Sequence, residues 1–419
     1  MKTKLLIGFS LLLTLNSFSQ DRVKLMFYNL LHYPTTQPSR ITNLEGILSD
    51  YQPDLFMVCE LENATGSANI LNSIQTQDGR YAACMYEDNQ STSSPLQQMA
   101  YYNTQKLTLT AEEVLPTTLR DINHYTFKLN TVDQAANPKY LDVFVTHLKA
   151  GQNSASAPNN ETKRLNSVNV FTTALASVPT NHYVVFSGDF NLYSANEPAY
   201  QEILDVTNSI VMVDPIDRFG NWHNGSSFQD IHTQAVFSTA DGNGHIGDGS
   251  WGGLDDRFDF IMLSENLQTD AEVYYKNNTY SAYGNNGNCY NKSVNDPVCS
   301  GTYSQTIRDY LFNFSDHLPV VLEIETTQTL TVSLENYTPN LISFTQGNLV
   351  TNQLVLNVNT HYLKNQNIYI YNQLGQQLFS IPVGTTKTLH INTSQLANGV
   401  YYTSTSKNQK SPLKFTKYN

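Results

Sequence analysis

Seven short apolar segments within the first 325 residues constrain most strongly what this chain of 419 residues can fold into. Each segment is rich in Val, Tyr, Phe or Leu, and several alternate polar with apolar residues, which predicts β-strands. Helical periodicity stands out at only two places, residues 40–51 and residues 161–177. Strands that outnumber the helices without strict alternation predict a sheet-on-sheet core covered by helices. The predicted strands are VKLMFYNL, DLFMVCEL, QMAYYNT, YLDVFVTHL, HYVVFSGDF, DRFDFIML and LPVVLEIE.

Polar side chains stand at or near the ends of six of these strands. A single Asp after a strand would indicate a turn or a cap. Six separate cases instead predict one polar site at an edge of the sandwich, because rigid strands hold such a constellation in place. The residues are Asn29, Glu60, His147, Asp189 with Asn191, Asp259, and Asp316 with His317.

The residue types in this set define the chemistry that the site can perform. Glu60, Asp316 and Asn29 offer hard oxygen ligands, which suit Mg²⁺, Mn²⁺ or Ca²⁺ rather than zinc. His147 and His317 can act as acids or bases near neutral pH. Metal-assisted attack of water on a phosphate ester requires a Lewis acid, an oriented base and donors for the developing charge. The sequence shows no nucleophile elbow, P-loop or dinucleotide fingerprint that would favour another reaction.

The order of the motifs YN, CE, TH, SGDFN, RFDFI and SDH resembles that of the endonuclease/exonuclease/phosphatase superfamily, the fold of pancreatic deoxyribonuclease. The resemblance covers residues 22–325, and GDFN followed by SDH is its most specific part. It implies an α/β (α+β) four-layer sandwich with two central mixed β-sheets. It also implies that the active site lies at the shared edge of these sheets.

Carried over residue by residue, the resemblance implies that Glu60 is the principal metal ligand, with Asn29 beside it. Asp316 resembles the residue that binds a second metal or a water. The implied cofactor is Mg²⁺ or Mn²⁺, with Ca²⁺ as a further option. Asn29 has the alternative role of capping the first strand. For Glu60, metal ligation is favoured because an unpaired carboxylate at the end of an apolar strand would be costly.

The resemblance also implies the catalytic residues. Asp189 and Asn191 match the family's GDxN pair, in which the Asp orients or deprotonates the attacking water and the Asn donates to the phosphate. His317 resembles the His that contacts the scissile phosphate, and Asp259 resembles the carboxylate that orients this His. His147 occupies a strand position where many members keep a His that acts as a general acid or a phosphate ligand.

Other charged residues leave alternatives open. Arg164 is the candidate for an auxiliary phosphate contact. Asp259 has the alternative of a structural ion pair with Arg257 or Arg308, and His147 has the alternative of a surface histidine. Supporting or structural roles are favoured for Asp230, His232 and His223.

The first 20 residues predict a secretory signal peptide. Lys2 and Lys4 precede the apolar run from Leu5 to Leu15, and Ser17-Phe18-Ser19 is a small-x-small cleavage site. The apolar run is shorter than the roughly 20 residues of a membrane span. We therefore expect an exported mature chain without a transmembrane segment, with a catalytic domain over residues 21–326.

A different composition begins after a linker at residues 327–339. Apolar and polar residues alternate between turn signals, which predicts a small β-sandwich over residues 340–419. The strings IYIYNQLGQQL, INTSQLANGVYY and KFTKYN resemble the C-terminal sorting domain of the type IX secretion system. The resemblance implies the type IX machinery as a partner and a secreted or cell-surface location; an immunoglobulin-like binding module is the alternative.

Because an exported chain meets an oxidising compartment, its four cysteines are candidates for disulfide formation. Cys289 and Cys299 flank a Gly- and Asn-rich stretch, which predicts a loop closed by a disulfide in an oxidising compartment, with two free thiols as the alternative. Cys59 and Cys84 stand in apolar runs, which predicts buried strand positions and leaves their pairing open. The Gly-rich stretch at residues 241–253 does not fit the helix–loop–helix calcium pattern and is expected to be a surface loop.

The net charge of −12 combines two unlike parts. Residues 336–419 hold six lysines and no acidic residue; without these lysines and Lys2 and Lys4, residues 21–335 carry −20. This acidity excludes a polycationic nucleic-acid binder, but not a nucleic-acid substrate, because a bound metal supplies positive charge locally. We expect it to make the protein depend on divalent cations as catalyst and as a screen.

An exported, metal-dependent phosphodiesterase, an extracellular endonuclease acting on DNA or RNA, is the function that these features favour. Because superfamily members also hydrolyse sphingomyelin and phosphoinositides, a phospholipid or small-molecule phosphoesterase is the alternative. A catalytically silent surface-binding protein is a third hypothesis, against which the complete set of site residues argues. We expect nucleic acid as the substrate and a monomer.

Overall fold

The computed structural model describes residues 21–35, 37–77, 79–90, 94–236, 252–330, 342–345, 347–358, 363, 366–384, 386, 388–405 and 412–418. The chain divides into two compact units, residues 1–332 and residues 333–419. The expected signal peptide, most of the Gly-rich stretch and most of the expected linker lie outside the described residues. Among the residues that the structure does describe, no helix combines the length and the apolarity that a membrane crossing requires.

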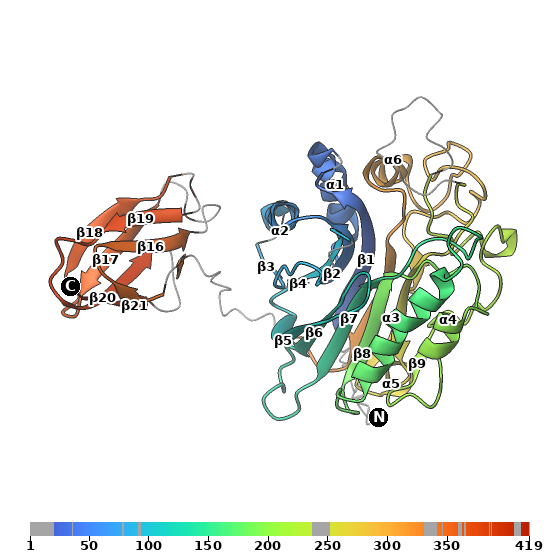
Figure 1. Ribbon diagram of the computed structural model, residues 1–419, viewed down its shortest axis with the longest axis horizontal. Helices are drawn as coiled ribbons and strands as arrows, with labels where there is room; N and C mark the ends of the chain where they lie inside the picture. The colour runs from blue at the N-terminus through green and yellow to red at the C-terminus, as the bar shows by residue number, and fades with distance from the viewer. Residues whose placement is uncertain are drawn as a thin grey trace, which may run out of the picture. The chain divides into compact units, whose positions relative to one another are not determined.

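The larger unit is built on two mixed sheets (Figure 1). In both sheets most neighbouring strands are antiparallel. The pairs β1–β2 and β7–β8 are parallel. The first sheet has the order β11-β13-β1-β2-β4-β3, with β12 also on β13; the second has the order β5-β6-β7-β8-β10-β9. The first sheet contains β1 (Asp21–Tyr33), β2 (Leu55–Leu61), β3 (Tyr81–Ala83), β4 (Gln97–Asn103), β11 (Val273–Tyr275), β12 (Ser281–Ala282) and β13 (Val320–Thr326). The second contains β5 (Leu107–Leu115), β6 (Ile122–Leu129), β7 (Tyr140–His147), β8 (Tyr183–Asp189), β9 (Met212–Val213) and β10 (Asp259–Ser264).

Three apolar cores separate four layers. Because side chains alternate along a strand, Leu25 and Phe27 of β1 point between the sheets, where they join Val143 and Val185 of the second sheet. The opposite face of the first sheet packs on α1 (Ile41–Tyr51), α2 (Ala64–Gln77) and α6 (Gln305–Phe314). The opposite face of the second sheet packs on α3 (Asn160–Leu175) and α4 (Pro198–Ile203), which lie side by side in Figure 1. The remaining short helices are η1 (Pro38–Arg40), η2 (Ser226–Phe228) and α5 (Asn266–Thr269).

This helix–sheet–sheet–helix arrangement confirms the predicted four-layer sandwich. All seven predicted strands are present, as β1, β2, β4, β7, β8, β10 and β13, and both predicted helices are present, as α1 and α3. The outermost strand β5 and the helix α2 gave no apolar pattern strong enough to predict. Most side chains of β5 are exposed, and α2 is rich in Ser, Asn and Thr.

The described residues of the unit 333–419 form a β-sandwich, which confirms the prediction for the end of the chain. Its core is apolar and includes Leu356, Ile368, Ile370 and Phe415. One sheet contains β14 (Ile342–Phe344), β16 (Gln353–Val358) and β19 (Thr388–Asn392). The other contains β15 (Leu349–Val350), β21 (Leu413–Lys417), β20 (Gly399–Thr405), β17 (Asn367–Asn372) and β18 (Gln377–Pro382).

Candidate active site

The second sheet places three of the predicted site residues in one row. His147 at the end of β7 is the register partner of Asp189 at the end of the parallel strand β8. Asp189 is in turn the partner of Asp259, the first residue of the antiparallel strand β10. The row therefore follows from strand pairing alone. His147 Nε2 lies 3.4 Å from Asp189 Oδ2.

The first sheet delivers its residues from bent backbone. The β1–β2 register shifts after Asn29, and Leu31, His32 and Glu60 have positive φ angles of 45°, 51° and 56°. These angles are uncommon for residues other than Gly, and such strain occurs often at functional sites. The bends bring Glu60 to Asn29, whose side-chain amide donates to Glu60 Oε1 and to Asp189 Oδ2, both at 3.0 Å. Asn29 thereby joins the two sheets.

His317 completes the site from the segment that precedes β13. Its Nδ1 lies 2.7 Å from Asp259 Oδ2, and its Nε2 lies 3.9 Å from both Asp189 Oδ2 and Asp316 Oδ2. Ser315 fixes this segment, because its hydroxyl donates to the Asn29 carbonyl and accepts from the His317 N–H. The Asp259–His317 pair predicted from the motif is therefore present.

Asn191 follows Asp189 on a turn. Its φ is 51°, and its backbone N–H donates to Asp189 Oδ1 at 3.1 Å. Its side-chain amide donates to the Leu148 carbonyl at 3.3 Å. The GDFN motif thus folds the chain so that Asn191 stays beside the row of the second sheet.

Burial perturbs the ionisation of the site. Burial raises the pKa of Asp189 to about 8; the His317 charge opposes this shift, whereas neighbouring carboxylates increase it. Burial also raises the pKa of Asp259, against the effect of His317. Burial alone would lower the pKa of His317, but the facing carboxylates, Asp259 first, raise it well above its usual value. Burial and the nearby Arg120 hold the pKa of His147 well below its usual value.

Two buried arginines flank the carboxylates, and no sequence motif points to either of them. Arg120 donates from Nε to the His147 carbonyl at 2.9 Å and from Nη2 to the Leu148 carbonyl. Arg40 donates to the carbonyls of Leu31, within the bend of β1, and of Phe314, the last residue of α6. Both guanidinium groups hold the backbone that carries site residues, and their charges act on the carboxylates at short range. An Arg that binds carbonyls from distant segments carries no local sequence pattern.

His32 is a further residue that the sequence analysis missed. Its backbone N–H donates to Glu60 Oε2 at 3.1 Å, and its ring Nε2 lies 3.5 Å from the same oxygen. Its Nδ1 lies 2.9 Å from Glu62 Oε1. The side chain is 43% exposed, so His32 stands where the buried cluster meets solvent.

The cluster offers donor atoms for a metal ion. Ligand atoms of Glu60, His147 and Asp189 lie within 4.8 Å of one another, and so do those of Asp189, Asp259 and His317. Buried carboxylates gathered this closely repel one another unless a cation or protons offset their charge. The oxygen-rich donor set fits a hard divalent cation. The Asn29 amide oxygen accepts the N–H of Leu31, while its amide nitrogen donates to the carboxylates of Glu60 and Asp189.

The structure does not bring Arg164 to this cluster. Its side chain is fully buried and pairs with Glu197 at 2.6 Å, and its Nη1 donates to the carbonyls of Lys149 and Gly151. These bonds correct the expectation of a phosphate contact, because they commit the guanidinium to Glu197, the residue before α4, and to the loop before α3.

The structure also decides between the alternative roles that the sequence left open for Asp259 and His147. Asp259 pairs with His317 and with neither arginine, since Arg257 pairs with Asp214 and Arg308 donates to backbone carbonyls. His147 is 4% exposed, so it is not a surface histidine. The residues for which structural roles were favoured have partners outside the cluster: Asp230 with Arg218, His232 with the carbonyls of Leu254 and Trp222, and His223 with Asp256.

The structure confirms the predicted disulfide and the predicted burial of the other two cysteines. Cys289 and Cys299 form a disulfide, with their Cα atoms 5.1 Å apart. Cys59 lies in β2 and Cys84 directly after β3; both are buried and free. The pairing that the sequence left open is thus absent from the structure.

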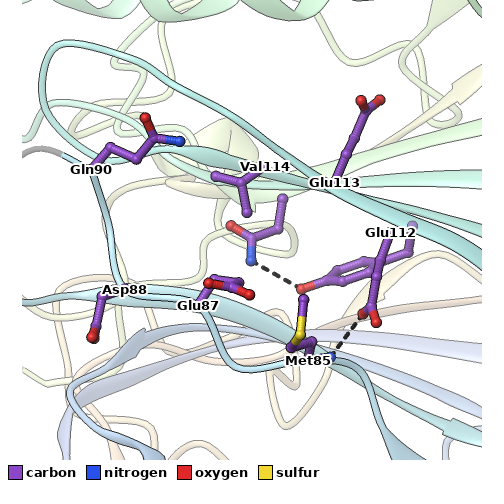
Figure 2. Close-up of a pocket in the computed structure, with 9 residues that line it drawn as sticks. Met85, Glu87, Asp88, Gln90, Glu112, Glu113 and Val114 are labelled. Atoms are coloured by element: carbon purple, nitrogen blue, oxygen red, sulfur yellow. Dashed lines mark hydrogen bonds between the residues drawn. The ribbon is translucent and has the colours of Figure 1, made fainter.

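A cavity of about 310 Å³ lies apart from the cluster (Figure 2). Figure 2 shows Glu112 beside Met85, whose backbone N–H donates to Glu112 Oε2. None of the described residues predicted for the site lines this cavity. Its lining is Met85, Glu87, Asp88, Gln90, Glu112, Glu113, Val114, Asn123 and Tyr125.

The chain carries a type IX sorting domain. Residues 348–416 match the family described as "Secretion system C-terminal sorting domain". This match confirms the resemblance found in the sequence and replaces the alternative of an immunoglobulin-like module. The protein is therefore directed to the cell surface or the exterior by type IX secretion. A comparison with curated protein sequences finds no match.

Solved structures that resemble the chain include three of low sequence identity. One is D. rerio TDP2, humanized by 14 mutations: 15% identity, TM-score 0.44, covering 73% of this chain and 99% of that chain. A second is the human Nocturnin catalytic domain with bound sulfate anion: 14% identity, TM-score 0.45, covering 74% of this chain and 98% of that chain. A third is an endonuclease/exonuclease/phosphatase family protein from Bacteroides thetaiotaomicron: 14% identity, TM-score 0.44, covering 73% of this chain and 98% of that chain. The third bears the name of the superfamily that the motifs resemble.

Proposed function

We propose that residues 21–326 form a secreted, divalent-metal-dependent phosphodiesterase, an extracellular endonuclease that hydrolyses DNA or RNA. Residues 327–339 are then a linker, and residues 340–419 the sorting domain. The observation that carries the proposal is the meeting of Glu60, Asp189 and His317 at one shared edge of two sheets. These residues come from chain segments more than 100 residues apart.

The metal would be held by Glu60, with oxygens of Asp189 at the end of β8 and of Asp316 before β13 as further donors. When bound, a divalent ion such as Mg²⁺ or Mn²⁺ supplies Lewis acidity for the phosphate ester. Asn29 holds the carboxylates of Glu60 and Asp189 close together, because its amide donates to both. Asp189 orients the attacking water and accepts its proton, a role for which a pKa raised by burial is suited.

His317 is the donor to the phosphate. Its Nδ1 is engaged by Asp259, which fixes the ring and leaves Nε2 directed at the cluster. A protonated ring is favoured, since the facing carboxylates raise the pKa of His317. Such a donor stabilises the charge that develops on a non-bridging oxygen in the transition state. His147, whose pKa is held low by burial, serves as a neutral donor or acceptor beside Glu60 and Asp189.

A nucleic-acid substrate suits the location and charge of the protein. A secreted enzyme meets extracellular polymer, and an acidic body of −20 gives little affinity for phosphates without a cation. Buried arginines such as Arg120 serve the backbone of the site and do not form a basic surface track. The proposal therefore predicts turnover that depends strongly on divalent ions.

The test is an assay of the purified chain with Mg²⁺ or Mn²⁺ on plasmid DNA, RNA, sphingomyelin vesicles and a chromogenic phosphodiester. We expect cleavage of the polynucleotides, loss of cleavage with EDTA, and loss in the Asp189→Ala variant. Turnover of sphingomyelin alone would favour the phospholipid alternative. Absence of turnover on every substrate, or turnover indifferent to EDTA and to Asp189→Ala, would contradict the proposal.

A further inference from the structure

Backbone hydrogen bonds connect the disulfide loop, residues 289–299, to His317 through one intermediate segment. Val294 of the loop donates its N–H to the Ala235 carbonyl at 2.8 Å. Ala235 donates its own N–H to the Asp316 carbonyl at 2.7 Å, and Leu318 donates to the Thr233 carbonyl at 2.6 Å. Residues 233–236 therefore lie between the disulfide loop and the two residues that flank His317.

The same segment holds the partner of His317. The Thr233 hydroxyl oxygen accepts the backbone N–H groups of Phe258 and Asp259, at 3.0 and 3.2 Å. Both members of the Asp259–His317 pair are thus attached to residues 233–236. A shift of this segment would change the 2.7 Å contact on which the orientation of the imidazole depends.

The disulfide loop is held by its two cysteines and by hydrogen bonds to neighbouring segments, among them the bond from the Leu254 N–H to the Lys292 carbonyl at 3.0 Å. It contains no helix or strand, and Cys289 and Cys299 are each 1% exposed within the apolar core that also contains Leu318. Arg308 of α6 donates to the Val294 and Asp296 carbonyls at 2.8 Å, and Gln305 of the same helix donates to the Asn295 carbonyl at 2.7 Å. The Tyr290 hydroxyl donates to the Asn224 carbonyl, also at 2.7 Å. Closing the loop through the disulfide limits the positions open to Val294, the residue that contacts Ala235.

We propose that the Cys289–Cys299 loop is a positioning element for the Asp259–His317 pair, so that opening the disulfide lowers turnover while the two sheets stay folded. The role in turnover rests on the proposed function; the effect on residues 233–236 and 315–318 rests on the fold alone. A misplacement of about 1 Å in a catalytic group can cost about 100-fold in rate. The disulfide would thereby couple full activity to the oxidising exterior to which the sorting domain directs the chain.

The experiment compares the oxidised full chain with the Cys289→Ser/Cys299→Ser variant and with the chain reduced by dithiothreitol. In the reduction, dithiothreitol gives two electrons and two protons to the cystine, which becomes two thiols, and leaves as its own cyclic disulfide. We expect amide hydrogen exchange at Ala235, Val294 and Leu318 to accelerate at least 10-fold in both open forms. Exchange in β1 and β8 should not change. We also expect kcat to fall about 10- to 100-fold, with KM changed less than about 3-fold.

Reductant added to the double Ser variant is the matched control, because it leaves only Cys59 and Cys84 to react. We expect no further change there. If the double variant does not fold, reduction of the folded chain, followed by thiol counting, carries the test. Unchanged exchange at Ala235 and Leu318 with an open disulfide would overturn the proposal, as would uniform acceleration across both sheets or unchanged kcat. A lack of turnover in the oxidised chain would contradict the proposed function instead, and the exchange data would still decide the positioning role.

Discussion

The two sheets of the larger unit deliver their site residues in different ways. The second sheet uses regular pairing, since His147, Asp189 and Asp259 are register partners across β7, β8 and β10. The first sheet uses irregular backbone, because Glu60 lies at a positive φ of 56° on the first-sheet side of the site. A non-Gly residue in such a conformation costs about 1–3 kcal/mol. The difference indicates that regular pairing fixes the row of one imidazole and two carboxylates on the second sheet, whereas the first sheet is bent around Glu60.

Asp189→Asn should cause the largest loss of kcat, and it tests the row of His147, Asp189 and Asp259 on the second sheet. The substitution keeps the shape and removes the proton acceptor, so we expect kcat to fall by about 10⁴-fold, the upper end for acid–base catalysis. The measurement is the rate of phosphodiester hydrolysis at saturating metal. Asp142→Asn is the matched control, because Asp142 is buried in β7 beside His124 and His182 but away from the cluster. Equal losses in the two variants would contradict a special role for Asp189.

Glu60→Gln should show that the bent first sheet serves the metal. We expect the apparent affinity for Mn²⁺ to fall at least about 10-fold, because a charged oxygen ligand becomes a neutral one. Excess Mn²⁺ should then restore a larger share of the rate than in Asp189→Asn, which loses a proton acceptor as well as a metal donor. Titration of turnover against Mn²⁺, with calorimetry of the ion alone, measures the effect. Glu62→Gln, which removes the charge that faces His32, is the control; a metal dependence identical in the two variants would refute the assignment.

Asp259→Asn tests whether the row of the second sheet extends to His317. The neutral amide no longer fixes the imidazolium, and we expect kcat to fall about 10- to 100-fold. Because Asp259 acts through His317, the effect should be non-additive with His317→Ala in a double-mutant cycle. Hydrolysis rates of the two single variants and the double variant give this coupling. Simple additivity would show that Asp259 acts elsewhere.

Regular strand pairing also explains why much of the fold and of the candidate site could be predicted from the sequence. Strands buried on both faces give apolar runs, and a polar residue such as Asp189 that interrupts or follows a run is conspicuous. Because neighbouring strands place such residues at one edge, a sheet-on-sheet core with one polar site could be predicted from the residues, and the four-layer sandwich followed from the family resemblance. The His317–Asp259 contact was predictable only from the family motif.

The features that were not predictable depend on long-range backbone contacts. Arg120 and Arg40 stand in polar segments and bind carbonyls of residues that are distant in sequence. His32 reaches Glu60 only because consecutive residues of β1 adopt left-handed backbone, which no composition signals. The pairing of Arg164 with Glu197 was not predicted, because the two buried residues lie 33 positions apart in the sequence.

The metal-free protein should lose stability as the pH rises, because the row of the second sheet is buried. The pKa of Asp189 is about 8 in the folded chain, against its usual 3.8. Between these values the folded state holds a proton that the unfolded state has released, so the stabilisation present at low pH is lost as the pH rises through 8. We expect the Tm in EDTA to fall by several degrees between pH 5 and pH 8. Asp189→Asn should flatten this dependence; an equally steep slope in the variant would assign it to other groups.

Arg164→Gln should have the smallest effect on catalysis, although Arg164 contacts the loop that follows His147. Removal of the guanidinium leaves Glu197 buried without its partner, which costs about 3–5 kcal/mol of stability. At a temperature where the variant stays folded, we expect kcat/KM to remain within about 2-fold, because no donor of Arg164 faces the cluster. Thermal unfolding and hydrolysis rates together separate the two effects, with Lys163→Ala on the exposed face of the same helix as the control. A large loss of kcat/KM in folded protein would restore Arg164 as a phosphate contact. It would also show that α3, the helix that packs on the second sheet, contributes a residue to the site.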